Sequence, residues 1–343
     1  MSERIQTELL EKLLPTLRAL EPASRAELDD DVVFGTGWHI SSHVLHGRKC
    51  DIYKVTNTTC TLALKVYKPD MTSDAAPDIQ YRALERCNQA AANQPILRAP
   101  KALAFLPDER AILMEWQQAG TLRSALWHRL ASPSQRLNLI AAAGTWLRAF
   151  HTLSGITMQP LDGAKLSAKL DTQMSRKPGA MATLNNCAAF QTALDRFQRK
   201  AAHTGNETPH ALLHGDYTPT NLLVDDVGII GMDMWGARRA PIFEDLARML
   251  TYLGVVSPFA LKASPLMPKS TLVRAFAQGY GDDLLSPISE TLYLILLYQQ
   301  LRRWMVYADR KTSRPYSPSV QWQLARNQHL CRQTLNWLDH CKT

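Results

Sequence analysis

The sequence predicts an α+β fold with two lobes: a small β-rich N-terminal lobe with one helix, and a larger α-rich C-terminal lobe. Its 343 residues suit two domains, or one unit of two lobes, at about 150 residues per domain. Short segments rich in β-branched and aromatic residues fill residues 38–67, whereas apolar residues at helical spacing dominate after Gln118. Because ligands commonly bind in clefts between such parts, we expect a binding cleft where the two lobes meet, near Gln117.

We expect three parts along the chain: an N-terminal helical extension at residues 1–30, the small lobe at residues 31–116 and the large lobe at residues 117–343. In the extension, leucines at nearly every fourth position between residues 4 and 20 predict an amphipathic helix. Such a helix packs on the rest of its own chain or, alternatively, on a second copy.

The small lobe is expected to contain five strands and one inserted helix. Three β-like segments separated by turn residues predict an antiparallel meander, and two more follow a helical segment that begins after Pro77. The expected strands cover residues 38–44, 50–56, 61–67, 101–105 and 110–115, and the expected helix covers residues 78–92.

The large lobe is expected to be mostly helical, because its apolar residues recur at helical spacing. The exception is residues 211–232, where apolar pairs alternate with turn signals and predict short strands. The expected helices cover residues 134–153, 182–202, 243–253, 270–280, 290–310 and 320–339.

Composition and charge restrict the possible partners. Hydrophobic residues make up 45% and charged residues 20% of the chain, as in an ordinary globular protein. The net charge is +8, and residues 292–343 hold eight basic residues against two acidic ones. A basic end is compatible with nucleic acid, but no recognition motif accompanies it and any anionic small molecule would be attracted equally. Nucleic acid is therefore not the favoured partner, and nothing in the sequence indicates an oligomeric state.

The chain also has the character of a soluble protein. No two of its six cysteines have the spacing of a zinc or redox pair, so we expect free thiols in a reducing compartment. Charged residues are spread through the first dozen positions, which lack the apolar segment of a signal peptide. The longest apolar run, residues 292–298, is far shorter than the ~20 residues that span a bilayer. We expect a cytoplasmic protein that does not interact with membranes.

The strongest chemical signal is an Asp and an Asn five residues apart on a tight loop, followed by a second Asp. These are Asp216, Asn221 and Asp233. Asp and Asn often serve only to satisfy the backbone of a turn. Phosphoryl transfer, however, needs a group that takes the proton of the acceptor hydroxyl and oxygen ligands for Mg²⁺. The spacing therefore predicts Asp216 as the base, with Asn221 and Asp233 as metal ligands.

The surrounding residues resemble a known family. The segment HGDYTPTNLLVDDVGIIGMD, followed by WGARRAPIFEDLARML, is similar to the core motif of the aminoglycoside phosphotransferase-like family. This family is the small-molecule branch of the protein-kinase-like fold and includes choline kinases and methylthioribose kinases. The resemblance extends from about Trp38 to Leu250 and implies an enzyme that uses ATP and Mg²⁺.

The resemblance also implies roles for individual residues. Asp216 matches the catalytic base, while Asn221 and Asp233 match the metal ligands. His214 matches a histidine that supports the catalytic loop. Asp245 matches a carboxylate that caps and anchors the following helix.

In the small lobe, Leu62-Ala63-Leu64-Lys65 has the form of the kinase strand whose lysine binds phosphate. Its acidic partner is expected on the next helix. Glu85 is the favoured candidate and Asp78, near the helix start, is the competitor. Backbone groups from Glu115 to Gln117 fall where this fold binds adenine.

The sequence departs from the family at three places. The phosphate loop around Gly47 has one glycine, so this turn either binds phosphate, aided by Arg48 or Lys49, or is a plain hairpin turn. No Phe-Gly follows Asp233, and no acidic residue lies two positions after it. The missing acidic residue disfavours choline as the acceptor.

Basic residues gather where the acceptor is expected. Arg238 and Arg239 face either an anionic acceptor or solvent, with solvent favoured. Residues 290–310 carry Tyr298 and Arg302 at the i, i+4 spacing of a helix face, either as part of the acceptor site or as a solvated basic stripe, again with the second favoured. Since aminoglycosides are polycationic, this basic character favours a neutral or anionic hydroxylated metabolite.

We therefore expect a kinase that transfers the γ-phosphate of ATP to a hydroxyl of a small molecule such as a sugar, an aminoglycoside-like compound or an amino alcohol. Two alternatives are a catalytically inactive, nucleotide-binding pseudokinase and a kinase of a macromolecular acceptor. The four residues Lys65, Asp216, Asn221 and Asp233 disfavour the first alternative. The eleven residues between Asp233 and Asp245, too few for an activation loop, disfavour the second.

Overall fold

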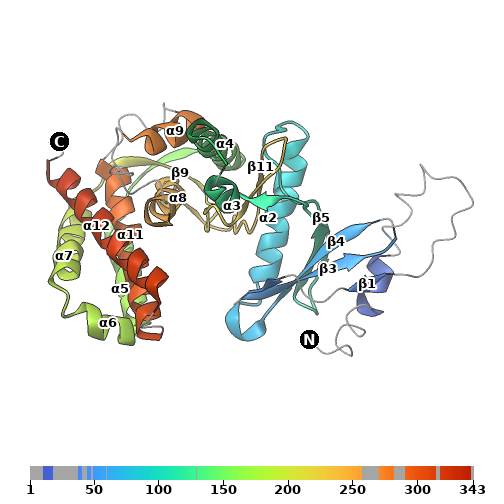
Figure 1. Ribbon diagram of the computed structural model, residues 1–343, viewed down its shortest axis with the longest axis horizontal. Coiled ribbons are helices and arrows are strands. Elements are labelled where there is room, and N and C mark those ends of the chain that lie inside the picture. The colour runs from blue at the N-terminus through green and yellow to red at the C-terminus, as the bar shows by residue number, and fades with distance from the viewer. Residues whose placement is uncertain are drawn as a thin grey trace, which may run out of the picture. The chain divides into compact units, whose positions relative to one another are not determined.

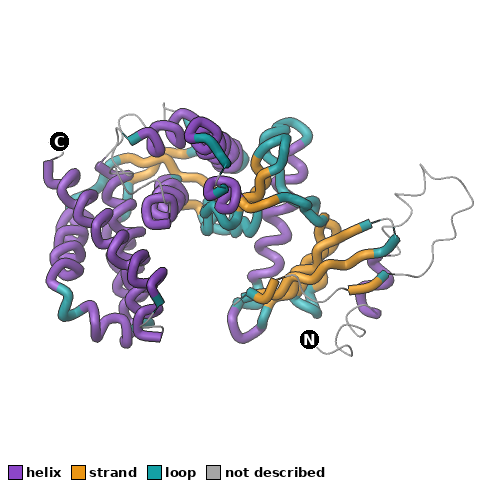
Figure 2. The backbone as a smooth tube through the Cα atoms, in the orientation of Figure 1, coloured by secondary structure: helices purple, strands orange, loops and turns teal. Residues whose placement is uncertain are grey.

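The structure is a computed structural model that describes residues 11–17, 38–40, 45–47, 49–58, 60–128, 130–256, 270–281, 290–313 and 317–340. It divides into two compact units. The first, here called the β-rich unit, comprises Met1–Gln89 and Ala99–Gln118, and the second, the helical unit, comprises Ala90–Arg98 and Ala119–Thr343. Figures 1 and 2 show strands dominating the first unit and helices the second. The predicted α+β fold class is confirmed.

The β-rich unit is built on one antiparallel sheet of six strands in the order β1-β3-β4-β6-β5, with β2 paired to β3. The strands are β1 His39–Ile40, β2 Leu45–His46, β3 Cys50–Thr56, β4 Thr61–Tyr67, β5 Ala102–Leu106 and β6 Ala111–Glu115. The expected strands at residues 50–56 and 61–67 coincide with β3 and β4. Of the expected strand at residues 38–44, residues 39–40 form β1 and residues 41–44 lie outside the described residues.

A hydrophobic core lies against this sheet. Leu13 and Leu17, from the helical segment at residues 11–17, are fully buried in one cluster with Trp38, Tyr53 and Leu64. The expected packing of the N-terminal helix on its own chain is confirmed for this segment, while residues 1–10 and 18–20 lie outside the described residues.

The helix α2, Ala76–Ala91, follows β4 and a short 3₁₀ helix, η2 Pro69–Met71. Its buried residues recur every three or four positions and include Gln80, Ala83, Leu84 and Cys87. This spacing places them on one face of the helix. On α2, Tyr81 stacks on Phe105 of β5 with ring centroids 5.6 Å apart.

The helical unit contains most of the helices in Figure 1. Those described are α3 Leu122–Trp127, α4 Pro133–Thr152, α5 Gly163–Ser175, α6 Pro178–Leu184, α7 Ala188–Ala202, α8 Phe243–Val256, α9 Thr271–Tyr280, α11 Glu290–Ser313 and α12 Pro318–His340. The single helix expected at residues 182–202 is wrong, because the chain turns at Asn185–Cys187 between α6 and α7. Asparagine pairs favour turns over helix interiors. The helix α5 was not expected at all.

The long helix α11 lies at the centre of the bundle and contacts α5, α6, α7, α8 and α12 (Figure 1). Residues 292–298, the longest apolar run, are all buried there. Their hydrophobicity therefore belongs to a core helix. None of the helices in the described part of the chain is long and apolar enough to cross a membrane. The cysteines in that part of the chain, Cys50, Cys60, Cys87, Cys187 and Cys331, are free thiols.

Two small antiparallel sheets hold the loops that carry the sequence motif. One has the order β11-β10-β7 and the other β12-β9-β8. The strands are β7 Gly120–Thr121, β8 Thr157–Pro160, β9 Glu207–Leu212, β10 Leu222–Val224, β11 Ile229–Gly231 and β12 Arg239–Pro241. The loop at residues 213–221 connects β9 to β10, and residues 232–238 return from β11 to β12. Both motif loops therefore have each end fixed in a sheet.

Two glycines allow α4 and α9 to approach closely. A Cβ atom at Gly279 of α9 would overlap the backbone of Ala141, and one at Gly144 of α4 would overlap the backbone of Phe276 and Tyr280. Because backbone atoms cannot move aside as a flexible side chain does, the contact requires glycine at both positions.

We expect Gly279→Ala to lower the free energy of unfolding by about 2 kcal/mol, because overpacking forces the two helices apart. Gly179→Ala is the matched control, since Gly179 lies in α6 with nothing within 4 Å of an added Cβ. This control should be neutral or stabilising by up to about 1 kcal/mol, the helix propensity difference. Urea denaturation of both variants measures the effect, and equal stabilities would contradict the close packing.

Candidate active site

The loop between β9 and β10 brings together two of the predicted residues. The Asn221 side chain donates through Nδ2 to the backbone oxygen of Asp216 at 2.9 Å and to its carboxylate Oδ2 at 3.0 Å. The Asp216 side chain is about half exposed, with 48% of its surface accessible. Since Nδ2 faces Asp216, the amide oxygen Oδ1 is the atom of Asn221 left to face a cation.

An arginine that the sequence analysis missed holds Asp216 from the other side. Arg248 of α8 donates through Nη1 to Asp216 Oδ1 at 2.8 Å. Burial alone would raise the pKa of Asp216, but the charge and hydrogen bond of Arg248 outweigh it and hold the pKa below its ordinary value. Asp216 is therefore ionised and oriented through both carboxylate oxygens. The sequence contains one indication of this role for Arg248, since it follows Asp245 by three residues and lies on the same face of the helix.

The backbone of the loop is fixed by a buried carboxylate, Asp245, in the first turn of α8. Its Oδ2 accepts the N–H of His214 at 2.7 Å, and its Oδ1 accepts the N–H of Gly215 at 3.0 Å. His151 of α4 approaches Oδ2 through Nε2 at 3.2 Å. The resemblance implied a carboxylate that caps its own helix. The structure corrects this expectation, since Asp245 anchors the preceding loop.

His214 is fully buried beside the aromatic rings of Trp146, Phe150 and Tyr217. Its Nδ1 accepts the backbone N–H of Asp216 at 3.4 Å. Burial lowers the pKa of His214 despite the carboxylates of Asp245, Asp216 and Asp233, which act in the opposite direction. A neutral, enclosed imidazole supports the loop next to the reacting group, which is a positioning role.

Asp233 lies just after β11 and is partly buried. Its φ angle of 57° is in the left-handed region, which non-glycine residues seldom adopt. Such backbone strain is concentrated at functional sites. Like Asp216, Asp233 acts to raise the pKa of His214, against the effect of burial.

The oxygen atoms of Asn221 and Asp233 suit a hard cation such as Mg²⁺. In the described residues, no group of three or more His, Cys, Asp or Glu side chains could hold a metal alone. A cation at this site would therefore complete its coordination with ligand phosphates and water, which is how Mg²⁺ commonly binds.

In the β-rich unit, Lys65 contacts a residue that the sequence did not lead us to expect. Lys65 is buried on β4 and donates through Nζ to Gln80 Oε1 of α2 at 2.8 Å. Tyr67, two residues further along and on the same face of β4, donates its hydroxyl to the same Gln80 oxygen. Glu85 instead faces Tyr81, whose pKa is raised by burial and by the Glu85 carboxylate. Glu85 lies five positions after Gln80, so the two side chains point about 140° apart around the helix axis.

The competing candidate, Asp78, forms an ion pair with Arg82 one turn along α2, at 2.9 Å. This contact lies within the helix and uses the carboxylate that could otherwise have served Lys65.

The remaining predicted residues of this unit lie at two turns. Gly47 donates its N–H to the Cys50 oxygen at 2.9 Å, and a Cβ atom at Gly47 would lie 2.5 Å from the same oxygen. The tight turn thus requires glycine, while Arg48 lies outside the described residues. Glu115 ends β6 with its N–H bonded to the oxygen of Lys101 at 2.9 Å, and Gln117 follows at the end of the unit.

The arginine pair after Asp233 is exposed, in line with the favoured expectation, but both arginines also make specific contacts. Arg238 forms a two-pronged ion pair with the buried Glu244, at 3.0 and 2.6 Å. Arg239 donates to the backbone oxygens of Gly155 and His210 at 2.9 and 3.2 Å.

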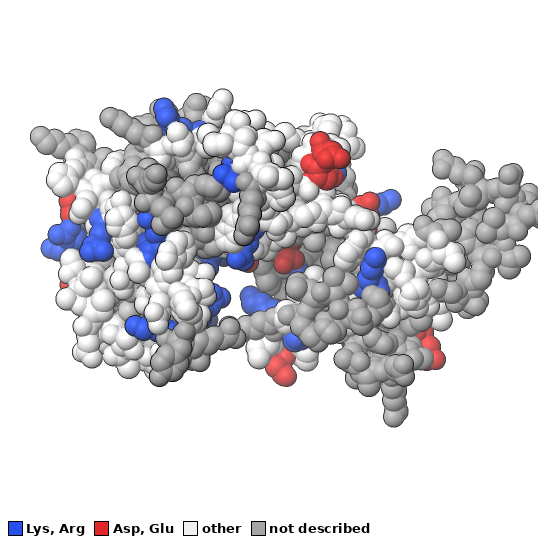
Figure 3. All heavy atoms as spheres, viewed as in Figure 1, with Lys and Arg blue, Asp and Glu red and all other residues white. Residues whose placement is uncertain are grey.

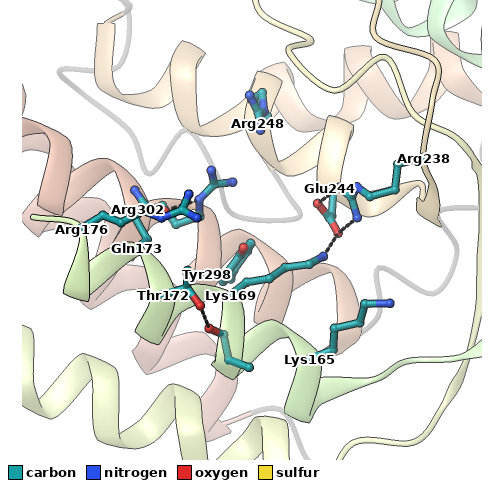
Figure 4. A pocket seen from close by; sticks show the side chains of 11 residues that line it. Lys165, Lys169, Thr172, Gln173, Arg176, Arg238, Glu244, Arg248, Tyr298 and Arg302 are labelled. Carbon is teal, nitrogen blue, oxygen red and sulfur yellow. Dashed lines mark hydrogen bonds and ion pairs between the residues drawn. The ribbon is translucent and has the colours of Figure 1, made fainter. Parts of the chain in front are cut away.

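A pocket of about 570 Å³ opens beside these residues, between α5, α8 and α11 (Figure 4). Tyr298 and Arg302 of α11 line it. The solvated stripe favoured for this helix is therefore wrong at these two positions. A smaller hollow of about 190 Å³ includes Asp216 in its wall and shares Gln173, Arg248 and Arg302 with the pocket. The carboxylate of Asp216 thus borders the smaller hollow, and the neighbouring larger pocket has the size of a small-molecule site.

Residues 44–287 match the profile of the phosphotransferase enzyme family. This match covers more than half of the chain, so the protein belongs to that family. The resemblance expected from the motif is confirmed. A comparison with curated proteins gives no match.

Solved structures of similar fold include a putative aminoglycoside phosphotransferase from Ralstonia eutropha, with a TM-score of 0.58 and 13% identity, covering 95% of this chain and 99% of that one. Amicoumacin kinase, in a complex with AMP-PNP, Ca²⁺ and Ami, gives a TM-score of 0.56 and 13% identity, covering 86% and 88%. A choline kinase from Streptococcus pneumoniae gives a TM-score of 0.53 and 15% identity, covering 87% of this chain and 94% of that one. At these identities the likeness is one of fold.

We expect Asp245→Asn to lower the free energy of unfolding by about 3 kcal/mol at pH 7, because the loop N–H groups lose a buried charged acceptor. Burial alone would raise the pKa of Asp245, but the hydrogen bond from His151 and the nearby charge of Arg248 help to hold it below its ordinary value of 3.8. The stabilisation by wild-type Asp245 is therefore complete above pH 3.8 and lost as the pH falls through the folded-state pKa.

The measurement is urea denaturation of wild type and variant at pH 7 and at pH 3.5. The difference between the two proteins should be smaller at the lower pH. Asp226→Asn changes an exposed carboxylate in the β10–β11 turn and should stay within about 0.5 kcal/mol of wild type at both pH values.

Proposed function

We propose that the protein transfers the γ-phosphate of Mg²⁺-ATP to a hydroxyl group of a small molecule. The observation that carries this proposal is the Asp216 carboxylate, held by Arg248 and Asn221 at the edge of a pocket in a member of the phosphotransferase family. The divalent ion and nucleotide analogue in the amicoumacin kinase structure support the choice of cofactors.

In this reaction Asp216 accepts the proton of the acceptor hydroxyl. The hydroxyl oxygen forms a new bond to the γ-phosphorus, the bond from that phosphorus to the β–γ bridging oxygen breaks, and ADP leaves. Since phosphoryl transfer needs little covalent help, the main tasks of the protein are positioning and charge stabilisation. Arg248 and Asn221 orient the base, and Asp245 and His214 hold the loop that carries it.

Asn221 and Asp233 would hold the magnesium ion. When bound, this ion neutralises the negative charge of the phosphate groups. Lys65 would contact the nucleotide phosphates, and Gln80 with Tyr67 would keep its ammonium group in place. The Gly47 turn would lie over the phosphates, and the backbone of Glu115 and Gln117 would bind the adenine.

Two alternatives predict different behaviour. A pseudokinase would bind ATP without transfer, yet Lys65, Asp216, Asn221 and Asp233 are all present and Asp216 is ionised. A macromolecular acceptor would need a docking surface near Asp216, and the short segment from Asp233 to Asp245 provides no insertion for one. A small acceptor therefore fits best, and the use of ATP suits a cytoplasmic location.

We expect Asp216→Asn to reduce ADP release in the presence of acceptor by about 10²–10⁴-fold, the usual contribution of a general base. Nucleotide affinity should change little, because Asp216 contacts the acceptor. Coupled ADP release and calorimetric binding of AMP-PNP with Mg²⁺ separate the two quantities. Equal losses of turnover and nucleotide affinity would count against the assigned role.

We expect Gln80→Ala to weaken ADP binding about ten-fold, because Lys65 loses a buried hydrogen bond that fixes its ammonium group. Glu85→Ala, on the same helix but away from Lys65, is the matched control and should keep wild-type affinity. Titration calorimetry with Mg²⁺-ADP provides the comparison. A loss of affinity in Glu85→Ala alone would reverse our assignment of the lysine partner.

A further inference from the structure

The pocket beside Asp216 has an unbalanced charge. Its wall holds six basic side chains and one acidic side chain, Glu244. The basic residues are Lys165, Lys169, Arg176, Arg238, Arg248 and Arg302. They come from α5, α8, α11 and the segment before β12, so several elements direct positive charge at one cavity (Figure 4).

The single acidic residue is already occupied. Glu244 is buried and accepts both prongs of the Arg238 guanidinium, at 3.0 and 2.6 Å. Lys169 lies 3.5 Å from the same carboxylate. One negative charge thus serves two cations, and none is left for the other basic residues of the wall.

The hydrogen-bond and ring contacts of Arg302 with described residues are all to neutral groups. Its Nε donates to Gln173 Oε1 at 2.7 Å, and its guanidinium lies over the Tyr298 ring, 5.4 Å from the centroid. Burial, together with the neighbouring charges of Arg248 and Arg238, lowers the pKa of Arg302. Lys165 lies on α5, and Arg176 directly follows the C-terminal end of this helix. Neither residue forms an ion pair with another described residue. Three of the six cations in the wall therefore have no carboxylate partner among the described residues, whereas Arg248 pairs with Asp216 and the other two share Glu244.

A basic surface alone would not mark a binding site. Lys and Arg side chains are scattered over the visible face of the helical unit (Figure 3), where water solvates each of them. The pocket differs because its cations face one another across a hollow. Lys165 and Arg176 are exposed, but Arg248 and Arg302 are partly buried. Like charges repel more strongly where solvent is restricted, so an anion in the hollow would relieve the repulsion between these two arginines.

The pocket also reaches the reacting group. The hollow that contains Asp216 shares Gln173, Arg248 and Arg302 with the pocket wall. Arg248 contacts Asp216 directly, at 2.8 Å. A ligand whose anionic group lies near Arg302 could therefore extend a hydroxyl past Arg248 to the Asp216 carboxylate.

We propose that the acceptor is an anionic alcohol: a small molecule with a phosphate or carboxylate group, bound by Arg302, Arg176 and Lys165, and a hydroxyl group directed at Asp216. This inference rests on the proposed function, because it names the acceptor of the same reaction. Polycationic acceptors such as aminoglycosides are excluded by the same charges that attract an oxyanion.

The test is calorimetric binding of matched probes in the presence of saturating AMP-PNP and Mg²⁺, which occupy the nucleotide site. Ribose 5-phosphate is compared with ribose, and glycerate with glycerol. At least one anionic probe should bind ten-fold or more tightly than its neutral counterpart. The two pairs distinguish a phosphate from a carboxylate as the recognised group.

The double variant Arg176→Gln/Arg302→Gln should weaken binding of that anionic probe at least ten-fold. Arg332→Gln, which removes the same charge from an exposed position on α12, is the matched control and should bind like wild type. Thermal melting establishes that all variants are folded. The inference is overturned if neither anionic probe binds more tightly than its neutral counterpart, or if the double variant keeps wild-type affinity.

Coupled ADP release with the same probes separates this inference from the proposed function. An anionic probe that binds through Arg302 without ADP release would refute the kinase assignment and leave the anion pocket in place. ADP release from a neutral probe, unchanged in the double variant, would support the kinase and refute the anionic acceptor.

Discussion

A single buried carboxylate, Asp245, determines the geometry of the candidate site. It accepts backbone N–H groups from His214 and Gly215 and is approached by the imidazole of His151. Leaving such groups without a charged acceptor in the protein interior is costly, so the loop has one favourable arrangement. Asp216, which follows directly, takes its position from this anchor.

One turn of α8 organises both the loop and the pocket. Glu244 neutralises Arg238 in the pocket wall, Asp245 fixes the loop backbone, and Arg248 orients the Asp216 carboxylate. Glu244 and Asp245 point about 100° apart, and Arg248 lies between them one turn further along the helix. A rigid helix packed on α11 and α12 thus sets the relative placement of base and acceptor cavity.

Local sequence patterns predicted the strands β3 and β4 and the Asp216 loop, because alternation and motif spacing are properties of neighbouring residues. They did not identify Gln80, because the kinase resemblance implied an acidic partner for Lys65. The buried stripe on α2 contains Gln80 and excludes Glu85, so helical periodicity was the better guide. Arg248 was missed as a site residue, and Arg302 was considered for the acceptor site but not favoured, for a different reason. Spacing shows which residues share a helix face, but only the packing of α5, α8 and α11 shows that these faces meet at one cavity.

The double engagement of Arg248 links two equilibria. Its guanidinium holds Asp216 and also faces the pocket, so an anion that draws it away also weakens its hold on the carboxylate. Asp216 would then bind a proton more readily at the moment the pocket fills. Thermodynamic reciprocity requires the converse, namely that protonation of Asp216 strengthens anion binding. Anion binding in the cavity and protonation of Asp216 are therefore coupled through Arg248.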